Sequence, residues 1–249
     1  MWLDGLIWLP LILLALDRTI ERRGAGYLTL ALTVCFLSTW YISYMIGGFC
    51  LLWLLCSAAR GEIPLRAAAP GPVSPAFTPV CPRSSSASSP DALPLPRALL
   101  ALVQRALLAL MLTSPVWLPS FLAMFSGKLS DATADYPALT NFGAEFLRQF
   151  LPGQYSSITS AALPYFFSGT VVTLLAAAFF FLRAVPLKRR LASAALIALL
   201  IASMWLSPLD RVWHLFKYPN WFPFRYAFLL SFALLNSLFP PSSSSTHLI

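Results

Sequence analysis

The side chains best suited to chemistry in this sequence are concentrated in one short segment, residues 207–227. A carboxylate, an imidazole, an amide and several cations alternate there with large aromatic rings: Asp210, Arg211, His214, Lys217, Asn220 and Arg225 lie among Trp213, Tyr218, Trp221 and Tyr226. Arginine forks match the oxygens of phosphate, and aromatic faces stack on flat or sugar-like groups. We therefore predict that this segment binds a phosphate-bearing, sugar-like or lipid head-group ligand.

The same residues also have a plainer interpretation. Tryptophan and tyrosine gather at membrane–water interfaces without binding anything, and an arginine near the end of an apolar span can extend to the surface. For the aromatic residues we favour this interfacial interpretation. For Arg225 we favour a functional role, because it lies one turn into the apolar stretch 222–239, and ionisable groups inside membrane segments are costly.

Several reaction classes have no support in the sequence. His214 is the only histidine outside the C-terminal tail, so a metal site would need carboxylates such as Asp210, and no ligand spacing indicates one. We expect no metal ion and no cofactor. The sequence contains no Walker loop, no G-x-G-x-x-G and no G-x-S-x-G motif, which argues against ATP-driven transport and serine hydrolysis.

Composition indicates what must position these residues. Of the 249 residues, 58% are hydrophobic and 10% are charged, whereas soluble domains carry about 25% charged residues. The net charge of +8 does not indicate nucleic-acid binding, because the charges lie between long apolar runs and no basic stripe with interleaved aromatics occurs. We predict an all-α, polytopic transmembrane helix bundle of about seven spans in a bacterial cell membrane, with membrane lipids as partners.

The predicted spans are residues 3–16, two within 24–59, and then 106–125, 163–182, 191–206 and 222–239. Residues 24–59 would form one helix of about 54 Å, too long for a hydrocarbon core of about 30 Å, so we expect a turn near residues 39–44. Trp40, Tyr41 and Tyr44 suit an interface at that turn. With two crossings there, twelve of the 17 basic residues fall on the cytoplasmic side, and Asp4 lies outside with the 207–221 loop. Pro115 and Pro119 should kink the span in which they lie.

These spans divide the chain into regions. Residues 1–59 hold about three spans, and residues 98–239 hold about four spans with outer loops at 126–162 and 207–221. Between them, the Pro/Ser-rich residues 60–97 read as a disordered cytoplasmic loop, and residues 240–249 as a disordered tail.

The first outer loop carries a helical pattern of its own. Leu139, Phe142, Phe146 and Phe150 have the spacing of one face of an amphipathic helix, which would start near Thr140 or Asn141 and end at Pro152-Gly153. Such a helix either packs on the bundle or lies at the lipid head groups as an interfacial helix.

The segment with the chemistry-bearing residues resembles the bacterial YfhO family of membrane proteins. The resemblance is carried by Pro208-Leu-Asp-Arg-Val-Trp-His214 followed by Pro219-Asn-Trp-Phe-Pro-Phe-Arg-Tyr-Ala-Phe228. Weaker matches are Trp2-Leu-Asp-Gly5, Trp40-Tyr-Ile-Ser-Tyr-Met45 and Leu163-Pro-Tyr-Phe-Phe-Ser-Gly169. The resemblance implies a C-type glycosyltransferase that moves a sugar from a polyprenyl-phosphate carrier to a cell-envelope polymer, of the teichoic or lipoteichoic acid type, at the outer face.

The resemblance leaves the catalytic residue open. In this architecture a carboxylate in the first large outer loop usually acts as general base, and that loop is expected to precede the region matched by Asp4. The residues at family-like or ligand-facing positions are Asp4, Asp210, Arg211, His214, Asn220, Arg225 and Tyr226. We expect an incomplete family member, in which a shifted reading frame would explain residues 60–96 and the tail. The alternatives are a permease or flippase-like subunit without enzymatic activity, and a truncated inactive product.

Overall fold

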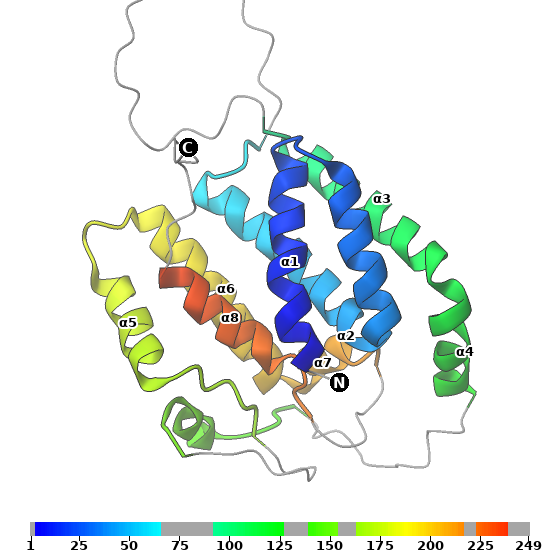
Figure 1. The fold of residues 1–249 in the computed structure, drawn as a ribbon. Helices are drawn as coiled ribbons and strands as arrows, with labels where there is room; N and C mark the ends of the chain where they lie inside the picture. The colour runs from blue at the N-terminus through cyan, green and yellow to red at the C-terminus, as the bar shows by residue number, and fades with distance from the viewer. Residues whose placement is uncertain (1–2, 66–91, 127–138, 154–162, 217–222, 239–249) are drawn as a thin grey trace, which may run out of the picture.

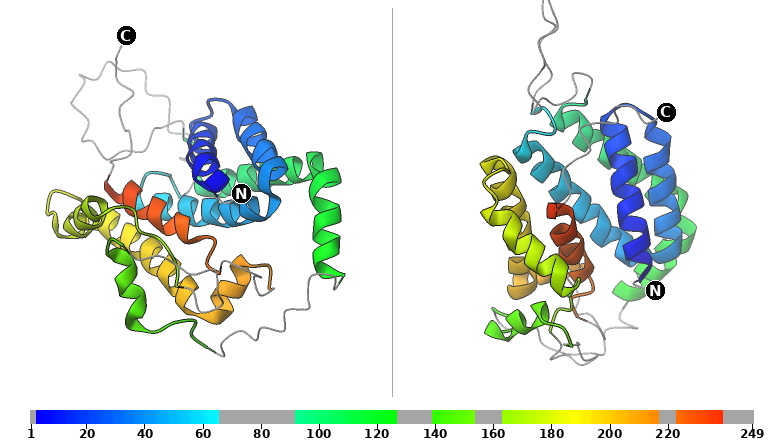
Figure 2. Two further views of the ribbon diagram at one scale, coloured as in Figure 1. Left: turned by 60° about the horizontal axis from the view of Figure 1, so that its bottom comes forward. Right: turned by 60° about the vertical axis from the view of Figure 1, so that its left-hand side comes forward.

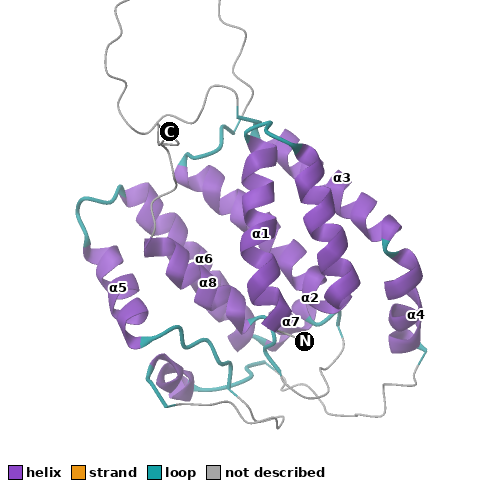
Figure 3. Cartoon of the chain, in the orientation of Figure 1, coloured by secondary structure: helices purple, strands orange, loops and turns teal. Residues whose placement is uncertain are grey.

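The computed structural model describes residues 3–65, 92–126, 139–153, 163–216 and 223–238. Every regular element in these ranges is a helix (Figure 3), apart from one isolated β-bridge between Thr140 and Leu206. The all-α prediction is therefore confirmed for this part of the chain. The elements are α1 (Leu3–Ile20), α2 (Ala25–Arg60), α3 (Leu95–Leu112), α4 (Ser114–Phe125), the 3₁₀ helix η1 (Ala144–Phe150), α5 (Thr170–Phe181), α6 (Leu187–Trp205), α7 (Ser207–Trp213) and α8 (Ala227–Leu238).

Helix α2 is sharply bent at a single residue. Thr39 has φ −154° and ψ 85°, an extended conformation that a β-branched residue adopts readily. The two halves of α2 run in different directions (Figure 1), so the first half packs beside α1 while the second half crosses back behind it. The bend lies at the start of the range, 39–44, in which the sequence predicts a turn.

The second half of α2 is the centre of the hydrophobic core. Phe49 is fully buried and meets Phe232 of α8 edge to face, with ring centroids 6.2 Å apart. Trp53, one turn further along, contacts the same Phe232 ring. On the other side, α1 packs on α2, and its residues Leu9 and Leu16 are also fully buried. The core thus joins α1, α2, α6 and α8 around one central helix.

The outward faces of several helices are also apolar. On α3 the exposed residues Leu100, Val103, Leu107 and Met111 recur at spacings of three and four, which places them on one stripe. A large exposed apolar surface of this kind is typical of a protein that lies in lipid.

A group of basic residues lies at one end of the bundle. The C-terminal ends of α1 and α2 and the first turn of α6 lie together there (Figure 1), and they carry Arg18, Arg60, Lys188, Arg189 and Arg190. We call this end the basic pole. The opposite end, the α7 pole, holds α7, the start of α1, the bend of α2 and the turn before α8 (Figures 1 and 2).

The helix boundaries do not confirm seven spans. Two helices are long and apolar enough to cross a membrane, Gly26–Arg60 and Leu95–Leu112, among the residues that the structure describes. Helices α1 and α6 have 18 and 19 residues, but each carries three charged residues near its ends. Helices α5 and α8 have 12 residues each, about 18 Å at 1.5 Å per residue.

Three predicted spans have different limits in the structure, each for a local reason. The span predicted at 106–125 is divided at Thr113 into α3 and α4, because Pro115 occupies the first turn of α4. The spans predicted at 163–182 and 222–239 begin seven and five residues later than expected, at Thr170 and Ala227. Gly169 precedes α5 with φ +106°, a conformation outside the helical region.

Several predictions concern residues outside the described ranges. They include most of the Pro/Ser-rich loop, the tail, much of the first outer loop, and Asn220. These stay predictions.

Helix α7 packs against the second half of α2 at Gly48. A Cβ atom on Gly48 would lie 3.3 Å from the Trp213 ring, whereas a Cβ on the neighbouring Gly47 would meet nothing within 4 Å. Gly48 therefore lets the indole approach the helix backbone.

We predict that Gly48→Leu lowers the free energy of unfolding by about 1–3 kcal/mol, because the added side chain would displace Trp213. The matched variant Gly47→Leu should leave stability unchanged or raise it by about 0.5–1 kcal/mol, since glycine is a poor helix former. Thermal unfolding of the two purified variants in the same detergent would measure the difference. Equal stability of the two variants would show that Trp213 does not pack here.

Candidate functional site

The α7 pole contains a buried polar cluster built on α7. Pro208 occupies the first turn of this short helix, where its missing N–H is not needed. Asp210 and His214 are four residues apart, so they lie on the same face of the helix. Their side chains are buried, with 2% and 0% of their surface exposed.

His214 connects α7 to the bend of α2. Its Nδ1 atom lies 2.5 Å from the hydroxyl of Tyr41, and its Nε2 atom lies 3.5 Å from Oδ1 of Asp210. When the Tyr41 hydroxyl donates to Nδ1, the imidazole carries its proton on Nε2, the nitrogen that faces the carboxylate. The three side chains are therefore neighbours, joined by a hydrogen bond at Nδ1 and by a close contact without a hydrogen bond at Nε2.

Tyr226 extends this cluster to α6. Its hydroxyl lies 2.8 Å from Oδ1 of Asp210 and 2.9 Å from the carbonyl oxygen of Ser203, and these two acceptors share its single proton. Its fully buried ring stacks on Trp213, with centroids 4.9 Å apart and planes 14° apart. Tyr226 thus acts as a structural centre of the cluster, since it has no exposed surface with which to touch a ligand.

Arg225 lies at the accessible edge of the cluster. Its guanidinium carbon is 5.4 Å from the centre of the Tyr41 ring, within the range of a cation–π interaction. Both residues are half-buried. The helix itself begins later than the span that the sequence predicts: α8 starts at Ala227, and Arg225 belongs to the preceding turn.

The start of α1 brings Asp4 to the same pole. A Cβ on the adjacent Gly5 would lie 2.9 Å from side-chain atoms of both Ile42 and Phe228. Those residues follow Tyr41 by one position and Arg225 by three. Asp4 is half-buried, so its carboxylate belongs to the accessible part of this pole rather than to its core.

The backbone is strained in the two segments next to the cluster, after His214 and before Arg225. Leu215 and Phe216, directly after His214, have φ values of 54° and 61°, and Phe224, directly before Arg225, has φ 61°. Bulky side chains rarely adopt this left-handed conformation, which costs roughly 1–3 kcal/mol per residue and is concentrated at functional sites. The Phe216 N–H donates to the Arg211 carbonyl, 2.7 Å away, and closes the end of α7.

A second segment braces α7 from outside. The Asn141 amide donates to the Met204 carbonyl and its oxygen accepts from the Ser207 hydroxyl, at 2.8 and 2.7 Å. The Trp205 indole donates to the carbonyl of Phe142, 3.0 Å away. These bonds fix the junction between α6 and α7, so the position of Asp210 depends on residues more than sixty positions earlier.

The amphipathic helix predicted from residue 139 onward is only partly present. The structure has the 3₁₀ helix η1, which starts at Ala144, whereas Leu139 lies before it and is exposed. Phe142, Phe146 and Phe150 form a series of ring contacts that ends on Phe166, so this face packs on the bundle. The packing that the sequence left open as one placement is present, and a position at the lipid head groups stays a prediction.

The polar side of η1 begins with a local hydrogen bond. The N–H of Gly143 donates to the Glu145 carboxylate, 2.9 Å away, and holds the pKa of that carboxyl below its usual range.

The structure brings together five of the predicted site residues and leaves one beside them. The residue beside them is Arg211, which is half-buried on α7 next to Asp210. Arg225 joins the cluster through Tyr41, whose hydroxyl bonds His214. Asn220 lies outside the described residues. Within those residues no group of three or more His, Cys, Asp or Glu side chains is placed to hold a metal ion.

Tyr41 is the site residue that sequence reasoning missed. The sequence places it only in an interfacial aromatic cluster, whereas in the structure it bonds His214, 173 positions away, and its ring lies under the Arg225 guanidinium. The available signal was topological, because the predicted turn at 39–44 and the 207–221 loop fall on the same side of the membrane.

Comparison with models of known protein families gives a match. The family model described as "Bacterial membrane protein YfhO" matches residues 1–238, which include every element described above. No curated protein and no solved structure matches the chain.

Tyr41→Phe should lower the free energy of unfolding by about 1–3 kcal/mol, because Nδ1 of the buried imidazole loses its partner. Tyr44→Phe is a matched control on the same helix, since the Tyr44 hydroxyl donates to the Val212 carbonyl, 2.7 Å away, at an exposed position. Its loss should cost less, about 0.5–1 kcal/mol, because water can replace the bond. Thermal unfolding in detergent measures both, and an equal or larger effect of Tyr44→Phe would contradict the assignment of Tyr41 to the buried cluster.

Proposed function

The chain belongs to the YfhO family of bacterial membrane proteins, and from this membership together with the α7 pole we propose a multi-pass glycosyltransferase of the bacterial cell membrane. It takes a sugar from a polyprenyl-phosphate carrier and places it on a cell-envelope polymer of the teichoic or lipoteichoic acid type, at the outer face. The observation that carries the proposal is the guanidinium of Arg225, held over Tyr41 by the buried cluster of Asp210 and His214.

The orientation follows from the two poles. Basic residues are retained on the cytoplasmic side of membrane proteins, so the basic pole faces the cytoplasm and the α7 pole faces outward. The bend at Thr39 turns one long apolar segment into two shorter ones, in keeping with the seven crossings that the sequence predicts. The exposed apolar stripe of α3 then faces lipid.

The proposed donor matches the α7 pole chemically. A polyprenyl chain stays in the bilayer while its phosphate and sugar lie at the interface, the depth at which Trp and Tyr gather. The Arg225 guanidinium can bind phosphate oxygens in a fork and stabilise the charge that the phosphate gains as leaving group. Tyr41 and the buried cluster hold that guanidinium in position.

The acceptor requires a group that removes a proton. As the acceptor hydroxyl attacks the anomeric carbon, the bond to the carrier phosphate breaks, its electron pair leaves with the phosphate, and the hydroxyl proton goes to a base. Asp210 is buried and engaged by Tyr226, so it is not available to an acceptor. Asp4 is half-buried at the same pole, and we assign the base to its carboxylate.

The orientation predicts opposite labelling of the two poles. In a variant without its four native cysteines, Lys188→Cys should react with a membrane-impermeant maleimide only after the cells are opened. Arg148→Cys, on the exposed side of η1, should react in intact cells. Labelling of both positions from the same side would refute the proposed topology.

Transfer should depend on Arg225 and Asp4 in different ways. With the full chain in proteoliposomes, a polyprenyl phosphate carrying a radiolabelled hexose, and lipoteichoic acid as acceptor, Arg225→Gln should lower kcat/KM about ten- to a hundredfold. Asp4→Asn should lower kcat about a hundredfold or more with little change in donor KM, because it removes a proton acceptor rather than a binding group.

Arg148→Gln is the matched control, since it removes an exposed cation on the same side without touching the cluster. Its activity should equal that of the unchanged protein. If the unchanged protein transfers no label, the enzymatic proposal fails. If Arg148→Gln loses as much activity as Arg225→Gln, the site assignment fails.

A further inference from the structure

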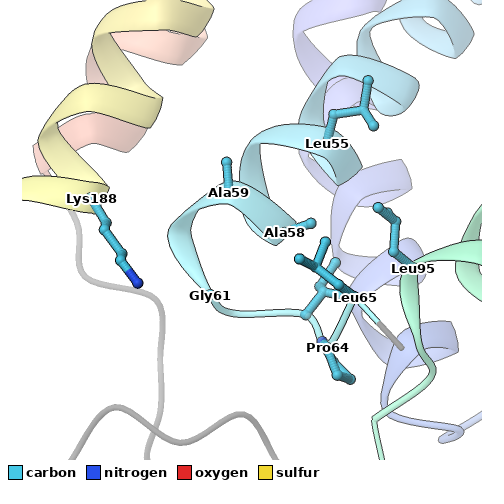
Figure 4. A pocket seen from close by; sticks show the side chains of 9 residues that line it. Leu55, Ala58, Ala59, Gly61, Pro64, Leu65, Leu95 and Lys188 are labelled. Atoms are coloured by element: carbon cyan, nitrogen blue, oxygen red, sulfur yellow. The ribbon is translucent and has the colours of Figure 1, made fainter. Parts of the chain in front are cut away.

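A groove at the basic pole is separate from the proposed transfer site. It is an open groove with a volume of about 660 Å³, within the range of roughly 300–1,000 Å³ typical of small-molecule sites. The groove lies between the end of α2, the loop that follows it, the start of α3 and the first turn of α6 (Figure 4). Its walls are almost entirely aliphatic, and its lining includes Leu55, Ala59, Ile63, Leu65 and Leu95.

One charged residue, Lys188, lines this apolar groove. Its side chain is exposed and extends from the first turn of α6 toward the side on which Ala59 and Gly61 lie (Figure 4). In the part of the chain that the structure describes, no ion pair joins Lys188 to a carboxylate. The Glu62 carboxylate, close by in the loop, lies 3.7 Å from the Arg60 guanidinium.

The first turn of α6, which includes Lys188, carries more positive charge than is favourable at the N-terminal end of a helix. The first turn of α6 carries Lys188, Arg189 and Arg190 and has no acidic residue, although the N-terminal end of a helix dipole is itself positive. Arg190 donates to the Phe180 carbonyl, 3.1 Å away, and the Arg189 guanidinium lies 5.9 Å from the Phe179 ring. These two arginines are therefore held against α5, while Lys188 extends toward the groove.

An apolar groove with a cationic rim fits an amphiphile with an anionic head. We propose that this groove binds an anionic phospholipid, with an acyl chain along the aliphatic walls and the phosphate against Lys188 and the first turn of α6. A neutral lipid would leave Lys188 without an anionic partner among the described residues, and a soluble anion would leave the apolar walls unused. Basic pockets between membrane helices bind acidic lipid head groups in this way. The site does not depend on the sugar-transfer proposal, because it uses none of its residues.

Native mass spectrometry of the full chain tests this lipid site directly. The protein is released from mixed micelles that contain equal amounts of phosphatidylglycerol and phosphatidylcholine with identical acyl chains. We expect the unchanged protein to retain phosphatidylglycerol in preference to phosphatidylcholine. Lys188→Gln should reduce that preference severalfold, and Ala59→Phe, which fills the groove, should reduce retention of both lipids.

Arg183→Gln is the matched control for charge, because Arg183 is an exposed cation in the turn between α5 and α6 and does not line the groove. It should retain both lipids as the unchanged protein does. Thermal unfolding of each variant confirms that the fold is intact, and Lys188→Gln changes only an exposed side chain.

Four results would overturn the proposal. An equal loss in Arg183→Gln would indicate attraction to overall charge, and full retention in Ala59→Phe would place the lipid elsewhere. Loss of a dimer in Ala59→Phe, without loss of lipid, would identify the groove as an interface between copies. Displacement of phosphatidylglycerol by millimolar glycerol phosphate, which has no acyl chain, would show that the apolar walls are not needed.

Discussion

Asp210 and His214 are buried in a largely apolar bundle, and their need for hydrogen-bonding partners determines how the α7 pole is arranged. A buried polar atom without a partner costs about 1–3 kcal/mol, more when it is charged. The hydrogen-bonding partners come from two other parts of the chain: Tyr41 at the bend of α2 bonds Nδ1 of His214, and Tyr226 before α8 bonds Asp210. Nε2 of His214 faces Asp210 at 3.5 Å without a hydrogen bond. Elements far apart in sequence are thereby held at one end of the molecule.

This arrangement separates residues that hold the site from residues that can meet a ligand. His214 and Tyr226 have no exposed surface, so their role is to position others. Arg225 and Asp4 are half-buried at the accessible edge of the α7 pole, next to buried residues whose packing fixes their positions. The left-handed conformations at Leu215, Phe216 and Phe224 are tolerated because the surrounding contacts determine the path of the chain there.

The two poles of the bundle use charge differently. At the α7 pole the positive charge of Arg225 lies over an aromatic ring beside a buried carboxylate, an arrangement with few charges and fixed geometry. At the basic pole several cations lie close together in one helix turn beside an aliphatic groove. The first suits a ligand whose orientation matters, and the second suits a lipid, which is recognised by its head-group charge and apolar chain.

The fold class, the bend of α2 and the region of the site follow from the sequence, because each depends on residue types within a short segment. Apolar content and sparse charge indicate a helical membrane protein, the length of residues 24–59 requires a bend, and the residue types of 207–227 mark the site region. The tertiary structure alone decided that Tyr41 bonds His214, that Gly48 receives Trp213, and that Arg225 precedes α8. It also decided the short lengths of α5 and α8, which apolar composition had suggested were full spans. The physical reason is that a side chain's partner depends on which helices meet, and two residues 173 positions apart carry no local pattern that pairs them.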